Sequence, residues 1–86
     1  MADITVYGAD WCSMTKRTLA HLDRQHVPYK YINIDRDRGA AGWVAAQNGG
    51  KEKKPTVDIA GHVLSEPSIQ ELDNVLREKG FEIRQA

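Results

Sequence analysis

Hydrophobic and polar positions in the first part of the chain follow two different periods. Residues 4–7 form a short β-prone run, which predicts a first strand. A helical pattern begins near Cys12 and runs to about Gln25, where Pro28 prevents its continuation. Its expected buried face has spacings of four, three and four residues: Thr15, Leu19, Leu22 and His26. The alternating residues 29–34 predict a second strand, and strand-helix-strand in one sheet implies a parallel pair with a right-handed crossover.

The middle of the chain predicts a short helix and a hairpin. Residues 40–47 form the helical run, with an aspartate ahead of it as a possible cap and the Asn-Gly-Gly of residues 48–50 as its end. The β runs 56–59 and 63–64 are close enough in sequence for a tight antiparallel hairpin. His62 is then expected in the turn between the two strands.

The last helix has the strongest local signals in the chain. Ser68 and Glu71 fit a capping box, and Gly80 is the expected stop. The apolar side chains of one face are Ile69, Leu72, Val75 and Leu76. With this helix the chain is predicted to be a single α/β domain over residues 1–86.

Charge and composition exclude several classes of function. Twelve basic and twelve acidic residues balance, which leaves no electrostatic footprint for nucleic acid. No apolar run approaches the ~20 residues of a membrane span, and the first residues lack a signal peptide, so a cytoplasmic monomer is expected. The three histidines have no spacing typical of a metal site, and His21 is expected on the surface. Trp43 is expected to close its helix onto the sheet.

Cys12 is the only cysteine, and its predicted place is the first turn of a helix. The first amides of a helix lack intrahelical partners and lie at the positive end of the macrodipole, which favours an anion. A thiolate, the reactive form of cysteine, is therefore favoured there. Cys12 is a candidate nucleophile; the alternative is a small hydrophobic side chain without a chemical role.

Four segments, taken in their order, carry a family resemblance. They are Ile4–Tyr7, Trp11–Thr15, Pro55–Gly61 and Ser65–Ser68. Together they resemble the glutaredoxin family of thioredoxin-fold oxidoreductases. The mycoredoxin-like branch, which serves small thiols other than glutathione, is resembled in three features: the tryptophan ahead of the cysteine, the Asn-Gly-Gly of residues 48–50 and the Pro-Ser of residues 67–68. The resemblance implies a thioredoxin fold in the order β-α-β-α-β-β-α, with a four-stranded mixed sheet flanked by three helices.

The same resemblance implies a site around Cys12. Cys12 would be the attacking thiolate, and Pro55 a cis-proline beside it that presents the backbone of Lys54 to an incoming disulfide. Thr15 stands where dithiol members have their second cysteine, which implies a monothiol route. Cys12 and Thr15 are the implied catalytic residues. The residues expected to bind the thiol substrate are Trp11, Ser13, Met14, Lys54, Pro55 and Ser68.

Two of these side chains leave alternatives open. The Thr15 hydroxyl either donates a hydrogen bond to the Cys12 thiolate or bonds back to a backbone carbonyl. Met14 either lines the site or plugs the space under the loop.

Departures from the family pattern bear on the small thiol. Glutathione-using members carry a lysine where this chain has Ala9, and a Gly-Gly-x-Asp-Asp run where it has Ser65–Ile69. Lys53 and Lys54 replace the family's Thr-Val and suit an anionic thiol or an acidic partner loop; alternatively they are solvated cations. The expected co-substrate is a mycothiol-like thiol or glutathione, with no permanently bound cofactor and no metal.

The leading hypothesis is a thiol-disulfide oxidoreductase acting on mixed disulfides. Its expected partners are small thiols and proteins that carry mixed disulfides, without nucleic acid or membrane. One alternative is an iron-sulfur cluster carrier, although Ser13 is bulkier than the glycine found in such relatives. The other is a redox-silent thioredoxin-fold binding module.

Overall fold

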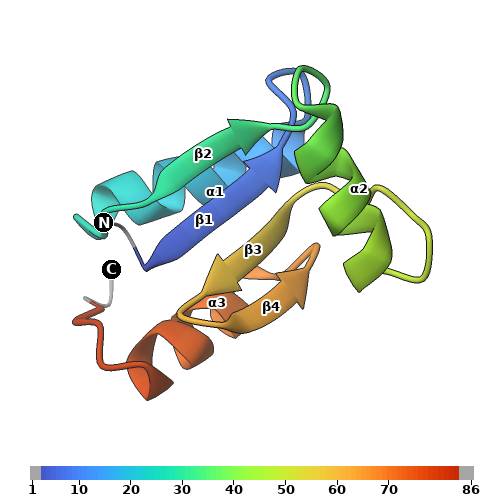
Figure 1. The fold of residues 1–86 in the computed structure, drawn as a ribbon. Coiled ribbons are helices and arrows are strands. Elements are labelled where there is room, and N and C mark those ends of the chain that lie inside the picture. The colour runs from blue at the N-terminus through green and yellow to red at the C-terminus, as the bar shows by residue number, and fades with distance from the viewer. Residues whose placement is uncertain (1–2, 84–86) are drawn as a thin grey trace.

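Four strands form one mixed sheet at the centre of the structure, a computed structural model that describes residues 3–83 (Figure 1). The strands are β1 (Ile4–Gly8), β2 (Lys30–Asn33), β3 (Thr56–Ile59) and β4 (His62–Ser65). Their order is β2-β1-β3-β4, with β1 parallel to β2, antiparallel to β3, and β3 antiparallel to β4. The predicted element order and mixed sheet are confirmed.

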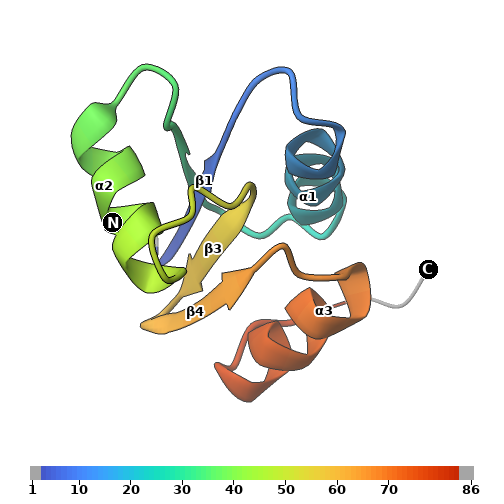
Figure 2. The same ribbon diagram turned by 90° about the vertical axis from the view of Figure 1, so that its right-hand side faces the viewer.

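Helices cover both faces of this sheet (Figure 2). The helices α1 (Ser13–Arg24) and α3 (Ile69–Glu78) lie on one face, and α2 (Arg38–Gln47) lies on the other. Trp43 of α2 is half-buried and stacks on Tyr7 of β1, with ring centroids 4.7 Å apart, so it packs its helix onto the sheet as predicted. Within residues 3–83, no helix has the length and apolar character needed to cross a membrane.

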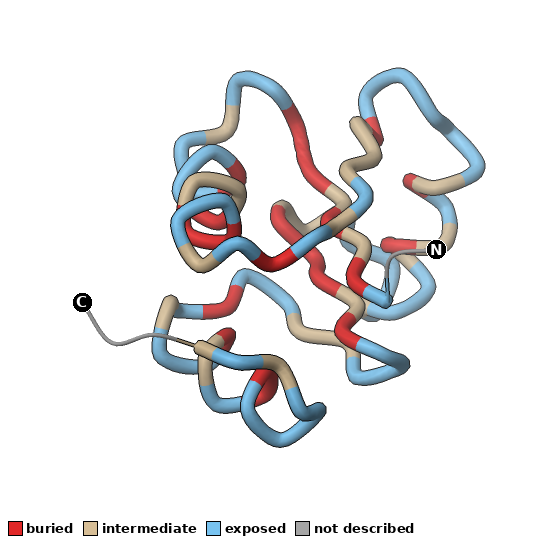
Figure 3. The backbone as a smooth tube through the Cα atoms, turned by 90° about the vertical axis from the view of Figure 1, so that its left-hand side faces the viewer, coloured by how far each residue is buried: buried red, intermediate tan, exposed pale blue. Residues whose placement is uncertain are grey.

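The core is divided by the sheet because successive residues of a strand point to opposite faces. Ile4 and Val6 of β1 join Leu22 of α1 and Leu72 of α3 in the larger apolar cluster, on the side of α1 and α3. Tyr7 packs against the smaller cluster on the α2 side, formed by Ile34, Ala41 and Val44. Figure 3 shows the buried positions gathered where helices and strands face each other. Complete burial of a side chain such as Leu72 contributes about 1.5–3 kcal/mol.

The end of α1 differs from the predicted pattern. His26 was expected on the buried face, but it is exposed and lies beyond the helix with φ +57°. Its N–H bonds the carbonyl of Asp23, and the N–H of Val27 bonds that of Leu22, which is a Schellman ending usually built on glycine. The turn buries Val27 and directs the chain back toward β2.

Local signals correctly predicted the β3–β4 hairpin and the start of α3. Ala60 (φ +50°) and Gly61 (φ +93°) form the turn, as in two-residue hairpins with both central residues at positive φ. His62 was expected in this turn but is the first residue of β4. At α3, the N–H of Glu71 donates to Ser68 Oγ at 3.1 Å and the N–H of Ser68 donates to Glu71 Oε1 at 2.9 Å, so the capping box is confirmed.

His21 was predicted on the surface, but it is buried, with a relative exposure of 7%. The packing of α3 beside α1 covers it. Its Nε2 lies 2.7 Å from Asp73 Oδ1 on α3. A polar contact therefore joins the two helices on this face of the sheet.

Candidate functional site

Cys12 lies between β1 and α1 as the N-cap residue of the helix. Its backbone is extended (φ −82°, ψ 119°), and its carbonyl accepts the N–H of Lys16 at 3.0 Å in the first helical turn. The free thiol is half-buried. It is thus held at the end of the helix where backbone amides lack helical partners.

The surroundings of Cys12 favour the thiolate. Burial raises the pKa of the Cys12 thiol, but hydrogen bonds from the Thr15 side chain and from the backbone of Thr15 and Met14 lower it, as does the charge of Lys54. The lowering causes prevail, and the pKa lies below the ordinary value of a cysteine. Since the thiolate is the nucleophile, this environment suits Cys12 to attack a disulfide.

Pro55 lies beside the thiol, and its bond to Lys54 is cis, as predicted. The S–H of Cys12 points to the carbonyl oxygen of Lys54, with Sγ and O 3.9 Å apart, although the two residues are 42 positions apart in sequence. Pro55 itself is buried, and its carbonyl accepts the N–H of Glu66 at 2.7 Å. The loop before β3 therefore forms one wall of the thiol site.

Thr15 lies under the thiol, one helical turn beyond it. It is buried, with 1% relative exposure, and its Oγ1 accepts the N–H of Ala9 at 3.4 Å. Burial, the largest effect, raises the pKa of the Cys12 thiol. Hydrogen bonding from the Thr15 side chain is the largest effect that lowers it. The Thr15 hydroxyl thus accepts a backbone N–H and also lowers the pKa of the Cys12 thiol.

Two apolar side chains beside the thiol are exposed. Trp11 has a relative exposure of 67% and Met14 of 41%. At this exposure the Met14 side chain does not plug the space under the loop. The indole N–H of Trp11 donates to Asp35 Oδ2 at 2.7 Å, and Lys54 Nζ lies 5.3 Å from the centroid of the Trp11 ring.

Asp35 is the residue at this site that sequence reasoning missed. It lies in the turn after β2, and its carboxylate contacts Trp11 across 24 positions of sequence. Nothing in the local pattern indicates this contact, because it depends on how the loop after β2 packs against the loop before α1. Lys53, in contrast to Lys54, is not among the causes that shift the Cys12 pKa.

A hollow of about 270 Å³ opens beside the thiol loop, between the starts of α1 and α3. Met14 and Arg17 line it from α1, and Glu66, Ser68 and Ile69 line it from the other side. The structure thus brings Met14 and Ser68, two of the expected thiol-binding residues, to one hollow. Ser13 is exposed beside them at the start of α1.

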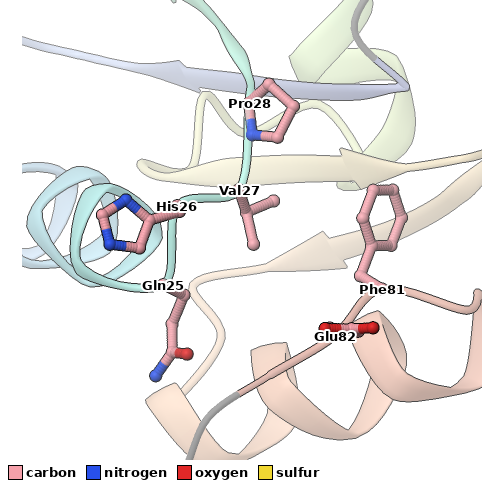
Figure 4. A pocket seen from close by; sticks show the side chains of 6 residues that line it. All are labelled: Gln25, His26, Val27, Pro28, Phe81 and Glu82. Carbon is pink, nitrogen blue, oxygen red and sulfur yellow. The ribbon is translucent and has the colours of Figure 1, made fainter.

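A second hollow lies at the opposite end of α1 from Cys12 (Figure 4). It has a volume of about 220 Å³ and is lined by residues of the turn after α1, including Val27, together with Phe81 from the segment after α3. The helix of 12 residues separates it from the thiol by about 18 Å. It is therefore not part of the thiol site.

Among residues 3–83, no group of three or more His, Cys, Asp or Glu side chains is placed to hold a metal ion. The chemistry available from the described side chains is that of a thiolate next to a cation and backbone amides.

Known proteins were compared with this chain. The glutaredoxin family model matches residues 4–64. A protein named as a glutaredoxin in Mycobacterium tuberculosis is 35% identical over 72 residues, covering 83% of this chain and 86% of that protein. Mycoredoxin 1 of Corynebacterium glutamicum is 39% identical over 57 residues, covering 66% of this chain and 70% of that protein.

The fold comparison agrees with the sequence comparison. The crystal structure of a glutaredoxin from Archaeoglobus fulgidus superposes with a TM-score of 0.79 at 26% identity, covering 90% of this chain and 88% of that one. The thioredoxin fold inferred from the resemblance is confirmed. With a matching family model, similar relatives and the expected fold, the chain belongs to the glutaredoxin family.

Proposed function

We propose that this chain reduces mixed disulfides between proteins and a low-molecular-weight thiol by a monothiol mechanism, with Cys12 as the nucleophile. One observation carries the proposal: the Cys12 thiol lies at the start of α1, facing the Lys54–Pro55 loop, in surroundings that lower its pKa. Family membership supports a redox function of the glutaredoxin type. The presence of a single cysteine supports the monothiol route.

The first step transfers the small thiol to the chain. The Cys12 thiolate attacks the small-thiol sulfur of the mixed disulfide, forms a new S–S bond to it, and breaks the bond to the protein sulfur. The protein leaves as a thiolate and takes a proton from water. Alignment of the three sulfurs is required, and the backbone of Lys54 next to Pro55 is suited to orient the substrate chain.

The second step restores Cys12. A free small thiol, as its thiolate, attacks the small-thiol sulfur attached to Cys12, and Cys12 leaves as the thiolate that its surroundings favour. Over the two steps, one free small thiol is oxidised as it joins the small thiol of the mixed disulfide, and one protein cysteine sulfur is reduced, so electrons balance. Thr15 acts in both steps by hydrogen bonding to the Cys12 sulfur as a thiolate.

The remaining site residues have binding roles in this proposal. Trp11, Ser13 and Met14 offer a contact surface at the start of α1, and Ser68 lies across the adjacent hollow. Lys54 supplies positive charge and Pro55 the wall beside the thiol.

A mycothiol-like thiol fits this binding surface better than glutathione. Ala9 is fully buried where glutathione-using members present a lysine, so no cation there meets a carboxylate. Ser68 and Glu71 already hydrogen-bond each other at the start of α3, and the negative charge of Glu71 opposes a carboxylate of glutathione there. The similarity to mycoredoxin 1 supports the same choice.

The test uses a reporter protein with one cysteine, held as a mixed disulfide with either mycothiol or glutathione. With the same free thiol present, we expect the chain to accelerate release of the reporter thiol, faster for mycothiol, and to show one small-thiol adduct on Cys12 by intact mass. Cys12→Ser is the matched control and should lack both. Full activity of Cys12→Ser would refute the mechanism, and an adduct with the reporter instead of the small thiol would refute the order of steps.

A further inference from the structure

Asp35 is linked to the thiol through two intervening side chains. Its Oδ2 accepts the indole N–H of Trp11 at 2.7 Å. The Trp11 ring faces Lys54 Nζ at 5.3 Å from the ring centroid, within the range of a cation–π contact. Lys54 in turn lies next to the thiol, since its carbonyl oxygen is 3.9 Å from Cys12 Sγ and its charge acts on Cys12.

Each link restrains a side chain that would otherwise be mobile. Trp11 is exposed at 67%, so packing alone does not determine the orientation of its ring, and a hydrogen bond to a carboxylate does. Lys54 has a flexible stem, and its ammonium group has one other described contact, a hydrogen bond donated to the carbonyl of Glu52 at 3.4 Å. The place of the ammonium therefore depends on the place of the indole.

We propose that Asp35 is a positioning residue of the thiol site: by accepting the indole N–H of Trp11, it holds the ring whose face keeps the Lys54 ammonium beside the Cys12 sulfur. The inference rests on the proposed function of Cys12 as a redox thiol. It assigns the exposed tryptophan a second role, because the ring offered to a substrate also fixes the cation next to the nucleophile.

Other ionisable groups lie around this site and have to be separated from the effect of Asp35. On β2, Tyr31 donates a hydrogen bond to Asp10 at 2.8 Å, and burial, then Asp10, then the charges of Asp35 and Cys12 raise its pKa. Asp35 also carries a negative charge of its own, which opposes a thiolate. Removal of its charge and of its hydrogen bond therefore act on Cys12 in opposite directions.

A matched pair of variants isolates the hydrogen bond. Asp35→Asn loses the charge and keeps an oxygen for the indole N–H, whereas Asp35→Ala loses both. Asp35 is exposed, so both chains should fold. The ultraviolet absorbance of the thiolate is titrated with pH in the full chain, with Cys12→Ser as the blank. We expect Asp35→Ala to ionise at higher pH than Asp35→Asn, with a thiolate fraction about two- to fivefold lower below the midpoint, the range of an exposed cation–π contact.

Trp11→Phe provides the second background. Phenylalanine keeps a ring face for Lys54 but has no N–H to donate. In the Trp11→Phe background, Asp35→Asn and Asp35→Ala should therefore give the same titration of the Cys12 thiol. Equal titrations in the wild-type background, or a difference that persists with Trp11→Phe, would overturn the inference. Because the readout is ionisation, a chain that shows the expected pattern but reduces no disulfide would refute the proposed function and leave the positioning role intact.

Discussion

Thr15 occupies the space in which a side chain at Gly8 would stand. A Cβ atom on Gly8 would lie 2.5 Å from both Cγ2 and Oγ1 of Thr15, which is itself buried. The last residue of β1 thus touches the first turn of α1 directly. This contact supports, from the sheet side, the Thr15 side chain, which lowers the pKa of the Cys12 thiol.

Gly8→Ala should therefore disturb both stability and the thiol. The added methyl meets a β-branched side chain with nowhere to move, and overpacking of this kind costs about 1–3 kcal/mol. Urea unfolding measures the loss, and the rate of Cys12 alkylation reports on the site. Gly42→Ala is the control, because nothing lies within 4 Å of its Cβ position on α2 and it should stabilise the chain by about 0.5–1 kcal/mol. Equal stabilities of the two variants would contradict the contact.

Thr15→Val should shift the pH dependence of Cys12 alkylation. The hydrogen bond from Thr15 lowers the pKa of the thiol against the raising effect of burial, so its removal raises the pKa and leaves less thiolate at any pH below the midpoint. A net hydrogen-bond contribution of about 0.5–1.5 kcal/mol corresponds to a rate about two- to tenfold slower there. Thr15→Ser retains the hydroxyl and should stay close to wild type. An unchanged profile for Thr15→Val would remove Thr15 from the mechanism.

Asp73→Ala should weaken the packing of α3 on α1. The variant leaves the buried ring of His21 without its partner at 2.7 Å, and an unpaired buried polar group costs about 1–3 kcal/mol. Asp73→Asn keeps an oxygen within reach of the ring and should cost less. Chemical denaturation of the two variants makes the comparison, and the interpretation fails if alanine and asparagine are equally tolerated.

The capping box of α3 should make stability depend on pH in acid. The backbone N–H of Ser68, and then its side chain, lower the pKa of Glu71 in the folded chain. A lowered folded pKa gives stability that is present above the unfolded value of about 4.3 and is lost as pH falls through the folded value. Wild type should exceed Glu71→Gln in unfolding free energy at neutral pH, and the difference should vanish in acid.

Ser68→Ala tests the other half of the same box. It removes the acceptor for the Glu71 N–H and should cost about 0.5–2 kcal/mol at neutral pH. Thermal unfolding is sufficient to detect this loss. A stability equal to wild type would mean that solvent replaces the cap without cost.

Elements governed by neighbours in sequence were predictable. The start of α3 follows from Ser68 and Glu71, which are three residues apart, and the β3–β4 hairpin follows from two β runs around a glycine. The placement of Pro55 beside Cys12 came from the family resemblance, because the contact spans 42 positions and no local pattern contains it.

Features that depend on packing between elements were missed. His21 looks like a surface residue until α3 covers it, and the contact of Asp35 with Trp11 forms only when their two loops meet. His26 adopts a positive φ that glycine usually supplies, so the sequence predicted where α1 ends but not the turn that ends it. In each case the deciding partner is distant in sequence or the residue type is unusual for its conformation.

The single thiol of the chain has a kinetic consequence. A domain with one cysteine cannot form an internal disulfide, so each exchange by the proposed route would leave the small thiol covalently attached to Cys12 at the start of α1. The lifetime of this adduct on Cys12 would be set by its next collision with a free thiol. The turnover rate of such a domain would therefore rise and fall with the concentration of free thiol in its surroundings.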